Sequence, residues 1–133
     1  MEIVTGQLRN QLLYLFGTHL VCAELAKHGI VPIVTSRNTR GVDVLAMSKD
    51  GRQSATIQVK TGRKRSRDWP IGEIDFENKT KQPYFVFVCL AGAEFRGGAE
   101  FYIVPNNMVV RRTRGYLEWK KKHPGKKECQ ASV

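Results

Sequence analysis

The sequence predicts an α/β (α+β) fold in which helices flank a single mixed central β-sheet. Three observations support this prediction. Apolar residues recur at helical spacing through residues 7–28, Asp50-Gly51 marks a hairpin turn, and residues 84–90 form a nearly continuous apolar run. The predicted order is helix, short strand, hairpin, connecting segment, two strands and helix. This order fits one domain over residues 1–125, followed by a flexible basic tail over residues 126–133.

The first helix is expected over residues 7–28, where leucines and other apolar residues are three and four positions apart. Gly17 interrupts this pattern, and a glycine inside a helix permits close packing against a neighbour. Gly29 is well placed to end the helix. Residues 30–34 then read as a short strand, and Pro32 indicates a sheet edge or a strand start.

The hairpin is expected to bring three polar side chains together. Asp50-Gly51 tolerates the positive φ angles of a two-residue type I′ turn. Counting outward from that turn places Asp43 directly opposite Gln58, with Cβ atoms roughly 5 Å apart. Lys60 lies two residues further along the same face, because strand side chains alternate. An acid, an amide and an ammonium group therefore converge at one end of the predicted sheet.

The second half of the chain predicts two further strands. Residues 69–81 lack clear periodicity and are interpreted as a loop with a possible short helix. Residues 84–90 are apolar and β-favouring, which is typical of a buried central strand. Residues 100–104 form the next expected strand, after a glycine-rich turn.

A terminal helix is expected over residues 116–123. Pro105-Asn106-Asn107 is interpreted as a break before it, and Pro124-Gly125 as its end. Tyr116 and Trp119 are at helical spacing, and this favours a packing role for both side chains.

Charge points to a polyanionic partner. The 133 residues include 22 Lys and Arg against 12 Asp and Glu, a formal net charge of +10. Such an excess favours nucleic acid over a membrane surface. No stretch approaches the roughly 18 apolar residues of a membrane span, and the N-terminus lacks the pattern of a signal peptide. Cys22, Cys89 and Cys129 are odd in number and form no C-x-x-C pair, which argues against disulfides and zinc and favours the cytoplasm.

The three hairpin side chains suggest metal-assisted phosphate chemistry. Asp43 and Gln58 offer oxygen donors of the kind that Mg²⁺ prefers, and that ion completes its coordination with waters and substrate phosphate. Lys60 is suited to orient or deprotonate an attacking water, or to neutralise charge on a phosphate. Basic residues near both ends of the hairpin are candidate nucleic-acid contacts: Arg40, Arg63, Lys64, Arg65 and Arg67.

At these residues the chain resembles the PD-(D/E)xK nuclease superfamily. The resemblance runs from Gly17 to Thr61 and is strongest at Gly41-Val42-Asp43 and at Ile57-Gln58-Val59-Lys60. It is similar to archaeal Holliday-junction resolvases and to intron-associated homing endonucleases with a Q-x-K motif. The resemblance implies a restriction-endonuclease-like αβββαβ core, Mg²⁺- or Mn²⁺-dependent phosphodiester hydrolysis and possible homodimers. It assigns Asp43, Gln58 and the Val59 carbonyl as metal ligands, and Lys60 as the catalytic lysine.

Two positions depart from that family's pattern. Gln58 replaces the second acid, and Thr18 stands where related proteins place a helical glutamate. Glu24 lies on the same helix, about 120° around its axis from Thr18. Three alternatives therefore stay open: a nucleic-acid-binding module that has lost cleavage, a basic subunit that binds a protein partner, and a solvated polar face with an ion pair worth less than about 1 kcal/mol.

Overall fold

The computed structural model describes residues 6–36, 41–63, 84–92 and 97–125, and all statements below refer to these residues. The element order is α1 (Gly6–Lys27), β1 (Val31–Val34), β2 (Val44–Met47), β3 (Ser54–Arg63), β4 (Tyr84–Leu90), β5 (Ala99–Pro105) and α2 (Asn106–Lys122). The described part of the chain thus has the α+β architecture and the order of elements that the sequence predicts. The expected loop or short helix over residues 69–81 and the tail over residues 126–133 lie outside the described residues.

The five strands form one mixed sheet in the order β1-β2-β3-β4-β5. Neighbouring strands are antiparallel except β3 and β4, which run parallel. A parallel pair needs a long crossover between its strands, and here residues 64–83 make that connection. The sheet therefore combines an antiparallel hairpin on one side with a parallel pair at its centre.

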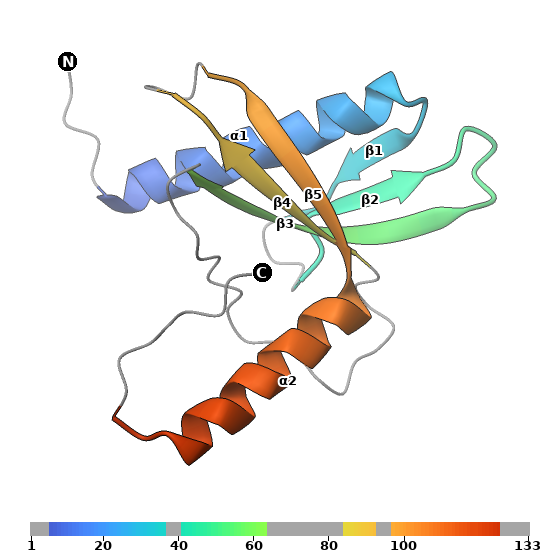
Figure 1. Cartoon of the computed structure of the whole chain (residues 1–133). Helices are drawn as coiled ribbons and strands as arrows, with labels where there is room; N and C mark the ends of the chain where they lie inside the picture. Colours follow the sequence, from blue (N-terminus) through green and yellow to red (C-terminus); the bar gives the residue numbers. More distant parts are fainter. Residues whose placement is uncertain (1–5, 37–40, 64–83, 93–96, 126–133) are drawn as a thin grey trace.

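The helices lie on opposite faces of the sheet (Figure 1). On one face, Val21 of α1 packs into a cluster with apolar side chains of four strands, including Val44, Val59 and Val88. On the other face, Val109 of α2 packs against aromatic residues of β4. From Phe85 to Leu90 the side chains of β4 are buried on both faces, and this confirms the prediction of a buried central strand, although Tyr84 at its start is exposed. No helix of the described residues is long and apolar enough to cross a membrane.

The end of α1 follows the sequence prediction closely. The N–H of Ile30 donates to the Leu25 carbonyl at 3.0 Å, and the N–H of Gly29 donates to the Ala26 carbonyl at 3.0 Å. These two bonds form a Schellman motif, in which the residue after the helix adopts a left-handed conformation. Gly29 has a φ of 74°, which glycine adopts without a Cβ penalty.

The register of the β2–β3 hairpin is the predicted one. Val44 faces Ile57 and Met47 faces Ser54. Both pairs are symmetric about Asp50-Gly51, where the sequence analysis placed the centre of the turn.

The loop of this hairpin is longer than predicted. Ser48 donates its N–H to the Gln53 carbonyl at 2.9 Å, so the loop comprises the four residues 49–52. Within it, the N–H of Gly51 donates to the Ser48 carbonyl at 2.9 Å, which closes a β-turn over residues 48–51. The carboxylate of Asp50 accepts from the Ser48 hydroxyl at 2.6 Å and from the Arg52 N–H at 3.1 Å. A four-residue loop keeps the predicted register because it has the same centre as the two-residue loop.

The C-terminal helix begins ten residues earlier than predicted. Asn106 is its first residue and Pro105 its N-cap. The Pro-Asn-Asn segment is therefore the start of the helix and not the predicted break before it. Proline is compatible with the start of a helix because the first helical N–H groups have no intrahelical partner. Val109, at 0% exposure, anchors this first turn on the sheet.

Candidate functional site

A β-bulge at the start of β2 determines where Asp43 points. Val44 pairs with Ile57, and the N–H of Asp43 also donates to the Ile57 carbonyl at 2.9 Å. Two consecutive residues of one strand therefore face a single residue of the other. Such a bulge bends its strand and redirects a side chain. Because of the bulge Asp43 faces Ile57, whereas counting outward from the turn predicts that it faces Gln58.

The carboxylate of Asp43 connects three elements. Its Oδ2 accepts the Val59 N–H of β3 at 2.7 Å, and its Oδ1 accepts the Tyr14 hydroxyl of α1 at 2.6 Å. Accepting a strand N–H places Oδ2 near the plane of the sheet, where a carbonyl of a continuing β2 would otherwise lie. Each carboxylate oxygen has a second lone pair, so the group retains acceptor capacity.

The backbone around Asp43 is also anchored. The N–H of Thr35 donates to the Asp43 carbonyl at 3.0 Å, and the Thr35 hydroxyl donates to the Val42 carbonyl. Gly41, just before, has a φ of 72°, a conformation that glycine adopts readily. These contacts hold the residues leading into β2 beside the end of β1.

Gln58 and Lys60 share the other face of β3. Ile57 and Val59 are buried under α1, so the alternating residues Gln58 and Lys60 point to the face that α2 approaches. Both are half-buried. In the parallel register Gln58 neighbours Phe85 and Lys60 neighbours Phe87.

Burial changes the acid–base behaviour of Lys60. Loss of solvation lowers the pKa of its ammonium group below 10.5, and the negative charge of Asp43 opposes part of that shift. Desolvation is the larger effect because the charged form of a lysine loses hydration beside apolar rings. Lys60 therefore releases a proton more readily than a surface lysine, and it does so within electrostatic reach of Asp43.

The two candidate contributions of the first helix differ sharply. Thr18 is fully buried against the sheet, and its hydroxyl has no hydrogen-bond partner among the described residues. Glu24 lies at the surface, where it pairs with Lys27 at 3.0 Å and with His28 at 3.5 Å. These ion pairs direct the Glu24 carboxylate along the outer face of α1, so it does not join Asp43.

Tyr14 belongs to the site through its hydrogen bond to Asp43, although no sequence motif predicts it. Tyr14, Thr18 and Val21 are spaced by four and three positions, so they lie on the side of α1 that faces the sheet. A tyrosine that packs against a sheet needs a partner for its hydroxyl, and that requirement was an available signal. Asp43 supplies the partner.

Gly17 allows α1 to approach β3 closely enough for this contact. A Cβ atom at Gly17 would lie 1.7 Å from the Thr61 hydroxyl oxygen and 2.7 Å from the Thr61 Cβ. The absence of a side chain at Gly17 therefore sets the distance between helix and strand. The close packing that the sequence analysis inferred for this glycine is present.

Of the five basic residues proposed to contact nucleic acid, one lies within the described residues. Arg63 is the exposed last residue of β3, three positions beyond Lys60. The other four, Arg40, Lys64, Arg65 and Arg67, lie outside the described residues.

The oxygen donors at this end of the sheet are compatible with Mg²⁺. In a strand the N–H and C=O of one residue point to the same side, so the Val59 carbonyl points toward the end of β2, as its N–H does. Asp43 Oδ2 therefore lies beside the Val59 peptide, whereas the Gln58 side chain points to the face that α2 approaches. Within the described ranges no three His, Cys, Asp or Glu side chains gather into a metal-binding group. The set carries one negative charge and needs further oxygens from water or phosphate.

Comparison with known proteins adds no further assignment. No family model matches this chain, and no curated protein matches it. The resemblance to PD-(D/E)xK nucleases therefore stays a prediction from the sequence between Gly17 and Thr61 alone.

Proposed function

We propose that this protein is a metal-dependent endonuclease-like phosphodiesterase that acts on nucleic acid, with DNA as the favoured substrate. The observation that carries the proposal is the placement of a fixed carboxylate beside a desolvated lysine. Asp43 is held by Tyr14 and by the Val59 N–H, and the pKa of Lys60 is lowered by burial while Asp43 acts on it electrostatically. A lysine whose pKa is lowered by desolvation and that has a carboxylate nearby is a candidate for proton transfer, because such shifts cluster at functional sites.

Each residue has a defined task in this proposal. Asp43, the Val59 carbonyl and the Gln58 amide would hold Mg²⁺ or Mn²⁺ together with substrate phosphate. The bound ion supplies Lewis-acid stabilisation of charge on the phosphate oxygens. Lys60 Nζ orients the attacking water and, in its neutral form, accepts a proton from it. The positive charge of the chain draws the polyanion to this surface.

A cleavage assay with matched variants tests the proposal. Linear, supercoiled and branched DNA are incubated with the protein and Mg²⁺ or Mn²⁺, and with EDTA as the metal-free control. Asp43→Asn and Lys60→Met should each lower the cleavage rate by at least about 100-fold, the size of typical acid–base and electrostatic contributions. Glu24→Gln and Lys27→Met change the same residue classes at the surface of α1 and should leave the rate within about twofold.

Two outcomes would contradict this function. Cleavage that survives both Asp43→Asn and Lys60→Met would show that the hydrolysis belongs to another site or to a contaminant. An equal loss of cleavage rate in the Glu24→Gln control would show that the substitutions act on the fold in general. Circular dichroism of each variant establishes that the chain is folded.

A second candidate is a nucleic-acid-binding module without cleavage. Specific observations favour it: both Asp43 oxygens already accept hydrogen bonds, and the glutamate position of the family holds the buried, neutral Thr18. In that case Asp43 is a structural link between α1, β2 and β3. Salt-sensitive DNA binding without cleavage under any metal condition would support this candidate.

Compartment and assembly are part of the proposal. Cys22 and Cys89 form no disulfide within the described part of the chain, and burial raises the pKa of Cys22, which disfavours the reactive thiolate. Free thiols in apolar surroundings suit a reducing compartment such as the cytoplasm. A homodimer would place two sites on a duplex, one for each strand, and sedimentation with and without DNA measures this.

A further inference from the structure

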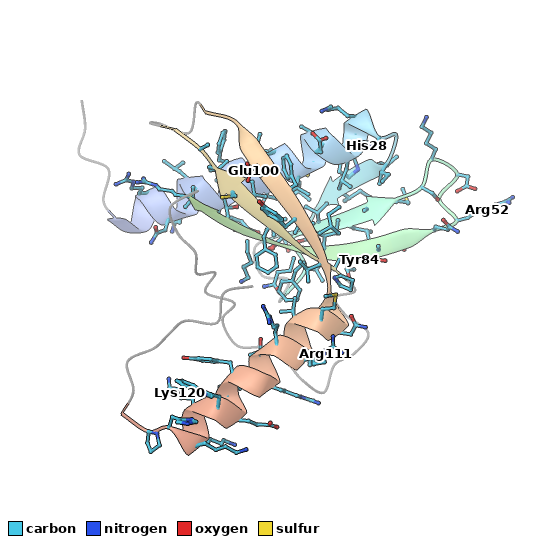
Figure 2. All side chains as sticks on the ribbon, in the orientation of Figure 1. His28, Arg52, Tyr84, Glu100, Arg111 and Lys120 are labelled. Carbon is cyan, nitrogen blue, oxygen red and sulfur yellow. The ribbon has the colours of Figure 1, made fainter. Side chains whose placement is uncertain are left out.

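Helix α2 extends far beyond the part of it that packs on the sheet. Its 17 residues span about 25 Å, whereas its fully buried residue, Val109, lies in the first turn. Figure 2 shows Arg111 near the sheet and Lys120 near the opposite end of the helix, away from the strands. Most of α2 is therefore available for a role other than filling the core.

The charge on α2 has one sign. Against the single acid Glu118 it carries six cationic side chains, which in chain order are Arg111, Arg112, Arg114, Lys120, Lys121 and Lys122. All six are exposed. Three lysines in the last turn also complement the helix dipole, so part of this pattern stabilises the helix itself. The dipole accounts for the last turn and not for the three arginines in the middle.

Three ring side chains form a ladder along the far half of α2. Tyr116 and Trp119 have ring centroids 6.4 Å apart with planes at 21°, and Trp119 and His123 have centroids 4.8 Å apart with planes at 22°. The His123 ring is fixed by its Nδ1–H, which donates to the Trp119 carbonyl at 2.9 Å. The Trp119 side chain is 37% exposed. The ladder is thus pre-ordered and still reaches solvent.

Cations flank this ladder on the same side of the helix. Arg112 lies four residues before Tyr116, and Lys120 lies four residues after it. Residues four positions apart are neighbours on a helix surface. Aromatic rings beside a row of cations suit single-stranded nucleic acid, whose bases stack on the rings while its phosphates meet the positive charges.

A purely structural explanation covers less of this pattern. Val109, Arg112, Tyr116, Trp119 and His123 follow one helical stripe that begins in the core, so the rings are readily interpreted as core packing. That interpretation accounts for a buried ring and leaves the solvent exposure of Trp119 unexplained.

We propose that α2 is a docking surface for a single-stranded nucleic-acid segment, with bases on the Tyr116–Trp119–His123 ladder and phosphates on its basic residues. Val109 packs on Phe85 and Phe87, whose strand neighbours on that face are Gln58 and Lys60. A strand bound along α2 therefore approaches the sheet on the face of Lys60. The inference deepens the proposed nuclease function and rests on it for the cleavage step: the substrate would contain unpaired nucleotides.

Binding without cleavage tests this surface. Fluorescein-labelled dT20, rU20 and a 20-base-pair duplex are titrated with the full chain carrying Asp43→Asn, in EDTA, and anisotropy gives each dissociation constant. Losing one stacked base costs about 1–3 kcal/mol, so Trp119→Leu should weaken dT20 binding about 5- to 150-fold. Phe16→Leu removes an exposed ring from α1, on the opposite face of the sheet, and should leave dT20 binding unchanged. Tighter binding of either single strand than of the duplex supports the proposal. The comparison of dT20 with rU20 then identifies the preferred sugar.

Charge and fluorescence provide two independent readouts. The double variant Lys121→Gln, Lys122→Gln should reduce the slope of log affinity against log salt by about 0.7 for each phosphate that it no longer neutralises. Lys49→Gln, on the hairpin loop, should leave that slope unchanged. The chain has two tryptophans, so Trp69→Phe leaves Trp119 as the single emitter, and dT20 should quench it.

The proposal is overturned if Trp119→Leu and Phe16→Leu bind dT20 equally, or if duplex binds better than both single strands. Binding to vesicles of anionic lipid, or to an acidic peptide, in preference to dT20 overturns it as well. Because the assay omits metal and cleavage, retained dT20 binding by a chain that never cuts DNA would refute the nuclease function and leave the docking surface intact.

Discussion

The substitution Gly17→Ala tests how α1 is positioned over the candidate site. The added Cβ would lie 1.7 Å from the Thr61 hydroxyl oxygen and 2.7 Å from the Thr61 Cβ. Rotation of the threonine side chain cannot relieve the second contact, because the position of Cβ is set by the backbone. Carbon atoms pack at about 3.5–4.0 Å. Helix and strand must therefore separate by about 1 Å.

Two opposing terms determine the free energy of unfolding of this variant. Replacing glycine by alanine inside a helix gains about 1 kcal/mol from backbone preference. Overpacking a filled interior costs about 1–3 kcal/mol, and a clash with a fixed Cβ belongs at the upper end of that range. We expect Gly17→Ala to be less stable than the wild type by about 2 kcal/mol. The same shift of α1 would carry the Tyr14 hydroxyl away from Asp43, beyond hydrogen-bonding distance.

Gly115→Ala is the matched control, since Gly115 is in α2 and nothing lies within 4 Å of an added Cβ there. It should gain about 1 kcal/mol. In urea unfolding with a slope near 2 kcal/mol/M, the midpoint of Gly17→Ala should fall by about 1 M, while that of Gly115→Ala rises. Thr61→Ala in the Gly17→Ala background should recover part of the loss. If Gly17→Ala is as stable as Gly115→Ala, the inferred close approach of α1 and β3 is wrong.

Three further predictions concern the same site. Thr18→Val removes a buried hydroxyl without a partner among the described residues and should raise the free energy of unfolding by about 1 kcal/mol. Thr18→Ser keeps the hydroxyl and should not raise it. A valine variant that is less stable than the wild type would contradict the reasoning. Tyr14→Phe removes a hydrogen bond to a carboxylate and should lower stability by about 1–2 kcal/mol, whereas an unchanged urea midpoint would show that the 2.6 Å contact contributes nothing. Burial lowers the pKa of Lys60 below 10.5, so between its folded-state pKa and 10.5 the unfolded chain binds more protons than the folded chain. Stability measured against Lys60→Met should therefore rise with pH across that window, and a difference that is flat with pH would refute the assignment.

Much of the fold could be predicted because its determinants are local. The helix stop at Gly29 follows from the left-handed conformation that a Schellman motif needs. The hairpin register follows from the centre of its turn, and the centre was correct although the loop has four residues. Burial of residues 85–90 on both faces follows from an apolar run without alternation.

The errors arose where tertiary contacts override local preference. A Pro-Asn-Asn segment is compatible with either a turn or a helix start, and burial of Val109 on the sheet selects the helix. The bulge at Asp43 could not be predicted by register counting, because alternation assumes one residue opposite one residue. Tyr14 was overlooked for a related reason: its partner is 29 positions away in sequence.

The hydrogen bonds of Asp43 bear directly on the choice between catalysis and binding. A carboxylate that accepts two strong hydrogen bonds is held in one orientation, and a functional group needs such support to act at a defined place. The same bonds would equally serve a purely structural link. The two roles make different demands on Lys60: a structural Asp43 has no need for a desolvated lysine nearby, whereas proton transfer at phosphate does. Because burial of that lysine costs stability at neutral pH and gives the fold no evident return, we favour catalysis.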